Sequence, residues 1–71
     1  MDGQQKLGVP AYEAIHVSCL WDFPTGWALR VVARRSGETW KQARTREYDH
    51  LTTSELGDAL SAELDHLVEP Q

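Results

Sequence analysis

Residues 12–34 read YEAIHVSCLWDFPTGWALRVVAR, and this stretch predicts a β-hairpin. Both halves alternate with a period of two and contain β-branched and aromatic residues, which is typical of strands. Pro24 and Gly26 stand between the halves and indicate a turn. The second strand is expected to have one apolar face and one partly basic face. The apolar face holds Trp27, Leu29, Val31 and Ala33, and the basic face holds Ala28, Arg30, Val32 and Arg34.

A second reversal is predicted at Ser36-Gly37, because glycine with a small polar residue is typical of hairpin turns. We therefore expect a third strand over residues 39–46. Three strands joined by short loops form an antiparallel meander.

The C-terminal third changes to the period of a helix. Thr52 and Glu55 have the spacing of a capping box, and Leu51 is placed to act as a hydrophobic staple in front of it. Pro70 is consistent with a helix that ends just before it. One apolar stripe of this helix is formed by Leu56, Leu60, Leu64 and Leu67.

The sequence thus predicts an α+β fold: a three-stranded antiparallel meander (β-β-β) followed by one C-terminal amphipathic helix packed on one sheet face. Residues 1–10 are expected to be a disordered lead-in, and residues 11–69 a single small ββ-β-α domain. The other face of the sheet is left without a covering element. The predicted core consists of Ile15, Val17, Trp21, Trp27, Leu29, Val31, Leu56, Leu60, Leu64 and Leu67.

Charge is separated along the chain. Six of the seven Lys and Arg residues fall within residues 30–46, beside one acid, Glu38. Residues 47–71 contain seven acids and neither Lys nor Arg. A basic middle and an acidic end give two opposite electrostatic surfaces, and such surfaces attract partners.

Catalytic and metal-binding patterns are weak, and we expect neither an enzyme nor a cofactor. The single cysteine, Cys19, cannot form an internal disulfide, and we interpret it as a small buried apolar residue. His16, His50 and His66 fall on a strand, a loop and a helix, without the close spacing of metal ligands. A domain of 71 residues also leaves little room for an enclosed substrate pocket.

The register of the second hairpin decides which side of the sheet Trp40 joins. With a two- or four-residue loop, Ala33 faces Trp40, and Trp40 belongs to the core. With a three-residue bulged loop, Arg34 pairs with Trp40 instead, and Trp40 lies among arginines on the outer face. A slip of one residue inverts the whole strand, so the sequence leaves both registers open.

The candidate binding surface is the basic strand pair, which in the second register suits phosphate contacts and base stacking. It comprises Arg30, Val32, Arg34, Trp40, Lys41, Arg44 and Arg46. Three strands followed by a helix, with Gly26-Trp27 opening a strand that leads to Arg30 and Arg34, is similar to the sheet-type DNA-binding domains of tyrosine recombinases and plant AP2 factors. This resemblance covers residues 26–67 and implies arginines and tryptophans that enter the major groove. The acidic final third and a pI near 5.1 depart from that pattern.

Glu63 is the irregular residue of the helix, because it lies at the edge of the leucine stripe. A carboxylate at that position needs a cation, and Lys41, Arg44 or Arg46 is expected to supply one in a structural ion pair.

The resulting hypothesis is a non-catalytic, self-associating protein-interaction module, with a sheet-type DNA-binding domain as the alternative. A core this thin favours further burial by self-association. The absence of Asn and an excess of Arg over Lys suggest a bacterial or phage accessory or regulatory protein. Without a signal-peptide pattern or a long apolar run, we expect a cytoplasmic protein that uses neither a membrane nor a small-molecule substrate.

Overall fold

The computed structural model describes residues 11–68, which form three strands and one helix. The predicted lead-in, residues 1–10, and the last residue of the predicted domain lie outside the described residues. The elements are β1 (Ala14–Asp22), β2 (Gly26–Arg34), β3 (Arg44–Leu51) and α1 (Thr53–Val68).

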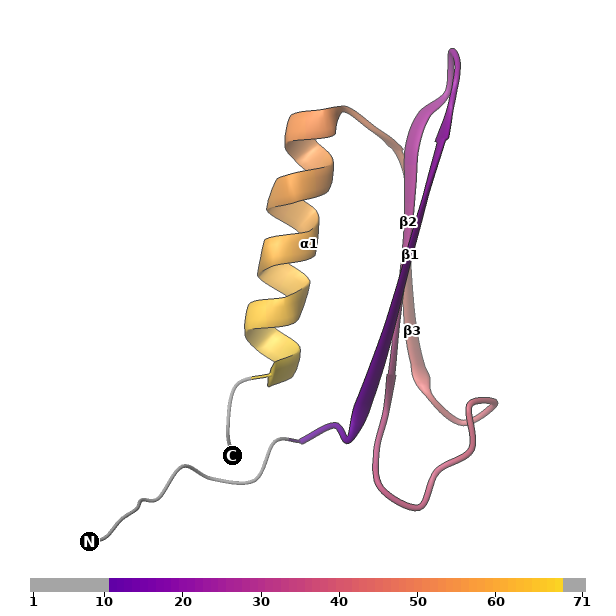
Figure 1. Ribbon diagram of the computed structural model, residues 1–71, viewed down its shortest axis with the longest axis vertical. Coiled ribbons are helices and arrows are strands. Elements are labelled where there is room, and N and C mark those ends of the chain that lie inside the picture. Colours follow the sequence, from indigo (N-terminus) through magenta and orange to yellow (C-terminus); the bar gives the residue numbers. More distant parts are fainter. Residues whose placement is uncertain (1–10, 69–71) are drawn as a thin grey trace, which may run out of the picture.

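The strands form one antiparallel sheet in the order β1-β2-β3, and α1 lies against one face of it (Figure 1). The predicted α+β meander with a C-terminal helix is thereby confirmed. The helix contacts β2 and β3. The β1–β2 hairpin extends past the first turn of the helix, and the β2–β3 loop curls onto the opposite side of the sheet (Figure 1).

The first hairpin has the alternation that the sequence predicts. Val17 pairs with Val31 and Cys19 with Leu29 on the helix side, while His16 pairs with Val32 on the outer side. Directly opposite residues of an antiparallel pair share a face. The helix side of this hairpin is therefore apolar.

The predicted third strand is wrong in position. Residues 39–43 form turns, in which the Gln42 side chain accepts a hydrogen bond from the Thr39 N–H and the Gln42 N–H donates to the Thr39 carbonyl. The strand begins only at Arg44, which pairs with Ala33. Both predicted registers are therefore wrong, since neither pairs Ala33 with Arg44.

A β-bulge and a close approach of backbones shape the far end of the sheet. Between the Leu29–Tyr48 and Trp27–Leu51 pairs, β3 holds one residue more than β2, and His50 within it has a positive φ of 60°. Gly26 has a φ of 99°, and a Cβ there would lie 2.9 Å from the Leu51 carbonyl oxygen. Only glycine meets both conditions without strain.

The helix begins with the predicted capping box. The Thr52 N–H donates to Glu55 Oε1 at 2.9 Å, and the Glu55 N–H donates to Thr52 Oγ1 at 3.1 Å. Trp27 adds a third contact by donating its Nε1–H to Thr53 Oγ1 at 3.0 Å. The two capping bonds use backbone N–H groups that the helix start leaves without partners, and the Trp27 bond joins the first turn of α1 to β2.

The core is thin and lies between β2 and α1. Its buried apolar residues are Leu29, Val31, Ala33 and Leu67. Around them pack the partly buried Tyr12, Ile15, Val17, Tyr48, Leu51, Leu56, Ala59 and Leu60. Trp21, predicted as core, is 53% exposed because it lies near the hairpin tip, where the centre of its ring is 5.6 Å from that of Trp27. The other predicted core residues, Trp27 and Leu64, are half-buried.

Candidate functional site

The sheet face opposite the helix carries a shallow groove of about 610 Å³. Trp40 reaches this groove from the β2–β3 loop. Three residues of the predicted binding surface line the groove: Arg30, Val32 and Trp40. The lining residues are His16, Arg30, Val32, Trp40, Thr45 and Glu47. Trp40 is thus exposed on the outer side, although not through either of the predicted registers.

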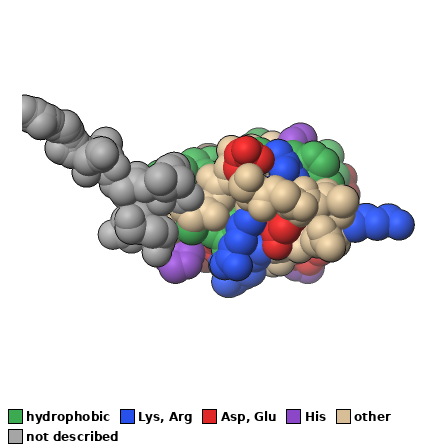
Figure 2. Space-filling view, turned by 90° about the horizontal axis from the view of Figure 1, so that it is seen from below, with side chains coloured by type: hydrophobic (Ala, Val, Ile, Leu, Met, Phe, Trp, Pro, Cys, Tyr) green, Lys and Arg blue, Asp and Glu red, His purple; other side chains and the backbone are tan. Residues whose placement is uncertain are grey.

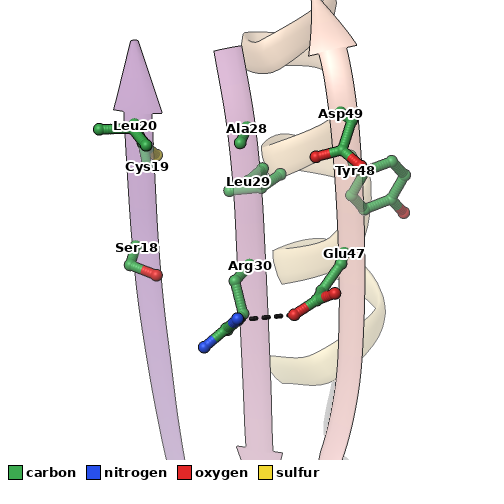
Figure 3. A pocket seen from close by; sticks show the side chains of 9 residues that line it. All are labelled: Ser18, Cys19, Leu20, Ala28, Leu29, Arg30, Glu47, Tyr48 and Asp49. Carbon is green, nitrogen blue, oxygen red and sulfur yellow. Dashed lines mark hydrogen bonds and ion pairs between the residues drawn. The ribbon is translucent and has the colours of Figure 1, made fainter. Parts of the chain in front are cut away.

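Arg30 is paired within this groove. Its Nε donates to Glu47 Oε2 at 2.8 Å, from β2 across to β3, as the dashed line in Figure 3 shows. Both side chains are more than half exposed, at 60% and 55%. The pair lies between the larger groove and a smaller pocket of about 270 Å³ that includes Ser18, Cys19 and Leu20 of β1 (Figure 3).

Arg34 is held by three neighbours. Its guanidinium lies 5.2 Å from the ring centre of Trp40, 3.2 Å from a carboxylate oxygen of Glu13, and donates to the Glu38 carbonyl oxygen at 3.2 Å. Its Nε is buried without a hydrogen-bond partner. Arg34 therefore fixes the loop and the start of β1 against the sheet, and one side of Trp40 is occupied by a cation.

Arg44 and Arg46 lie on the side of the sheet that faces the helix, not on the outer face. They pair with Ala33 and Val31, whose side chains are buried in the core. Their guanidinium groups approach Glu63 of α1, with Arg44 Nη1 3.4 Å from Oε1 and Arg46 Nη2 3.8 Å from Oε2. The register that pairs Arg44 with Ala33 puts these two residues on the inner side.

Glu63 is the centre of this inner polar cluster, and only 7% of it is exposed. It also accepts a hydrogen bond from the Tyr48 hydroxyl. That hydrogen bond, with the charges of Arg46 and Arg44, holds the pKa of Glu63 below its ordinary value although burial acts to raise it. The same hydrogen bond and burial raise the pKa of Tyr48. The cluster therefore keeps a charged carboxylate and a neutral phenol between sheet and helix.

The basic window does not form one continuous cationic surface. Arg30, Arg34, Arg44 and Arg46 each lie within 4 Å of a carboxylate oxygen, and Lys41 lies exposed in the loop. Figure 2 shows the end of the molecule that carries the β2–β3 loop, and there Lys and Arg side chains lie next to Asp and Glu side chains. Four of the six cations thus contact three carboxylates, because Arg44 and Arg46 share Glu63, while the Arg35 guanidinium lies over the ring of Tyr12.

A second surface, whose residues are not among the candidates from the sequence, is the free edge of β1. Among residues 11–68, no Cα of α1 lies within 8 Å of a Cα of β1. Three large apolar side chains are exposed there: Leu20 (66%), Trp21 (53%) and, in the turn that follows, Phe23 (82%). The interpretation of Cys19 as a buried residue is wrong, because on this edge strand its side chain is exposed beside them. In Figure 3, β1 forms one margin of the sheet, and the Leu20 side chain extends beyond it.

The two edge strands of the sheet differ in composition. β3 contains four charged residues and a bulge, which are features that discourage a further strand from pairing. β1 contains Asp22 as its only charged residue and neither Lys nor Pro along its nine residues. This contrast is visible in the sequence, but its meaning depends on knowing that β1 is an edge.

Within residues 11–68, no three His, Cys, Asp or Glu side chains are close enough together to hold a metal ion. The described part of the chain also has no helix that is long and apolar enough to cross a membrane.

Comparison with known proteins finds no family model, no curated protein and no solved structure that matches this chain.

Proposed function

We propose that this chain is a non-catalytic protein-interaction module that self-associates through the free edge of β1. The observation that carries the proposal is an uncharged run of an edge strand, uncovered by the helix, with Leu20 and Trp21 exposed on it. An edge strand offers a row of unpaired N–H and C=O groups, and a second strand satisfies them while it covers the apolar side chains.

The thin core supports the same proposal. Only four apolar residues are buried among residues 11–68. A single core in a domain of this size supplies little stability, and oligomerisation is one of the usual supports. Self-association buries apolar area that the monomer leaves in water.

Nucleic-acid binding through the basic strand pair has less support. A phosphate-binding surface needs free cations, whereas Arg30 and Arg34 are each paired with a carboxylate on the outer face. Arg44 and Arg46 face the helix and Glu63. Four of the five arginines of the basic window are therefore engaged by carboxylates of the chain itself.

The proposal is tested by sedimentation equilibrium of the purified chain from low to high micromolar concentration. We expect a reversible dimer for the native sequence and a monomer for Leu20→Lys, because a lysine on an edge strand opposes pairing. The matched control is Val68→Lys, which places the same charge on a similarly exposed apolar residue at the end of α1. This control is expected to dimerise as the native chain does.

Two results would overturn the proposal. One is a native chain that stays monomeric at high micromolar concentration with a cooperative thermal transition. The other is a Leu20→Lys variant whose dimerisation constant equals that of Val68→Lys, since the association would then involve another surface.

A further inference from the structure

We infer that two copies pair through β1 in antiparallel orientation, with Cys19 on the twofold axis and His16 of each copy opposite Asp22 of the other. This inference rests on the proposed self-association through β1 and adds its register. The product is a continuous six-stranded sheet in the order β3-β2-β1-β1-β2-β3. Such an interface is isologous, so every contact occurs twice.

The twofold axis fixes which residues meet. Neighbouring antiparallel strands related by such an axis keep both helices on the same side of the sheet, so helix-side residues meet helix-side residues. The two β2 strands are then separated by three strand spacings of about 4.8 Å, or about 14 Å. Helices pack at about 8–10 Å, so the two α1 helices flank the joined β1 strands closely without colliding.

The register centred on Cys19 matches the chemistry of both faces. On the helix side, Val17 of one copy meets Trp21 of the other, and Phe23 reaches Ile15 beyond it. All four are apolar, and Trp21 and Phe23 are the exposed ones. Phe23, the most exposed apolar side chain, and Trp21 thereby gain apolar neighbours.

On the outer side, the same register places the Asp22 carboxylate opposite the imidazole of His16, which can donate a hydrogen bond to it. The pair supplies a hydrogen-bond donor and an acceptor at both ends of the interface. Ser18 lies opposite Leu20 between them. Asp22 is the only acid of β1, and this register gives it a donor.

The neighbouring registers are less favourable. In the register centred on Ser18, Asp22 lies opposite Ala14, and Phe23 lies opposite the exposed Glu13. Centred on Leu20, the paired segment shortens to residues 18–22, and Pro24, which has no N–H, falls opposite His16. The Ser18 register therefore leaves Asp22 and Phe23 without matching neighbours. The Leu20 register loses hydrogen bonds of the strand ladder.

Disulfide trapping tests the register, because Cys19 is the only cysteine of the chain. Directly opposite Cα atoms of antiparallel strands lie about 4.5–5.5 Å apart, within the span of a disulfide. Diagonal neighbours lie about 7–8 Å apart and cannot be bridged without movement of the backbone. In the test, diamide takes up the two electrons and two protons that two thiols release as the S–S bond forms.

The experiment compares the native chain with Cys19→Ser/Ser18→Cys and Cys19→Ser/Leu20→Cys at one protein concentration. Linked dimer is measured over time by intact mass under non-reducing conditions. We expect the native chain to link at least tenfold faster than either variant. Faster linking of either variant would overturn the register while leaving self-association intact.

A charge exchange provides an independent measurement. His16→Asp places two carboxylates opposite each other at both ends, and we expect the dimer dissociation constant to rise about twofold to thirtyfold. Adding Asp22→Lys restores an opposite pair and is expected to recover most of the loss. Absence of recovery would contradict the register. A native chain that is monomeric by sedimentation and does not link would overturn the register and the proposed function together.

Discussion

Replacing Glu63 with glutamine tests how the polar cluster holds the helix against the sheet. Glutamine keeps the volume of the side chain and can still accept a hydrogen bond from Tyr48, but it removes the negative charge that faces Arg44 and Arg46. At an effective dielectric constant of 20, unit charges 3.4 Å and 3.8 Å apart attract by about 4–5 kcal/mol each before desolvation is subtracted.

The net loss is smaller than this Coulomb energy. Charging a carboxylate in a site that is 7% exposed costs most of that attraction, and Arg46 is half exposed, so solvent screens its contribution. We therefore expect Glu63→Gln to lower the free energy of unfolding by about 1–3 kcal/mol. In a domain of this size that corresponds to a fall in Tm of about 4–8 °C for each kcal/mol.

The matched control is Glu47→Gln, which breaks the 2.8 Å pair with Arg30. Although this distance is shorter, both side chains are more than half exposed, and we expect a loss of about 0.5 kcal/mol or less. Urea unfolding followed by tryptophan fluorescence, at one protein concentration, measures both variants. The reasoning fails if Glu63→Gln costs no more than Glu47→Gln, because burial would then not determine the strength of the pair.

Further predictions concern the backbone, the helix cap and the response to pH. Gly26→Ala is expected to cost about 2 kcal/mol or more, from positive φ and the Leu51 carbonyl contact, while Gly57→Ala, with open space around it, gains about 1 kcal/mol; thermal unfolding separates these opposite signs. Thr52→Ala removes the cap to Glu55 and is expected to cost about 1 kcal/mol, measured by urea unfolding followed by circular dichroism. Because the pKa of Glu63 is lowered in the folded chain, its contribution is complete above the unfolded value near 4.5 and is lost as the pH falls through the folded value. The stability difference between the native chain and Glu63→Gln should therefore shrink in acid and persist at neutral pH.

The order of the elements was predictable from the sequence because β1, β2 and α1 follow simple rules. β2 alternates apolar and polar residues, and Thr52 and Glu55 stand at capping-box spacing before a leucine stripe. The buried face of β2 is apolar, and the start of α1 is capped by polar side chains. Local pattern and tertiary packing then agree.

The position of β3 was not predictable by the same rules, because its buried side is polar. Arg44, Arg46 and Tyr48 face the helix and are satisfied by Glu63. A search for apolar alternation misses a strand of this kind. The usable signal in the sequence was Glu63, the carboxylate at the edge of the leucine stripe. It required cations from the sheet face that packs against the helix.

The candidate site was only partly visible in the sequence. The basic window is plain in the charge pattern, yet its pairing with Glu13, Glu47 and Glu63 depends on which strands are neighbours. The free edge of β1 follows from the meander order that the sequence predicts, but the exposure of the apolar side chains along it is known only from the structure. Exposed Leu20 and Phe23 acquire meaning as an interaction surface from that order.

Amide hydrogen exchange at two protein concentrations tests the central claim most directly, because it reports which backbone groups gain partners on association. In β1 (Ala14–Asp22), we expect the amides directed away from β2 to exchange at least tenfold more slowly at high micromolar than at low micromolar concentration. Amides in the middle of α1 should show no comparable change. Exchange in β1 that is independent of concentration, or protection that appears along β3 instead, would contradict self-association through the β1 edge.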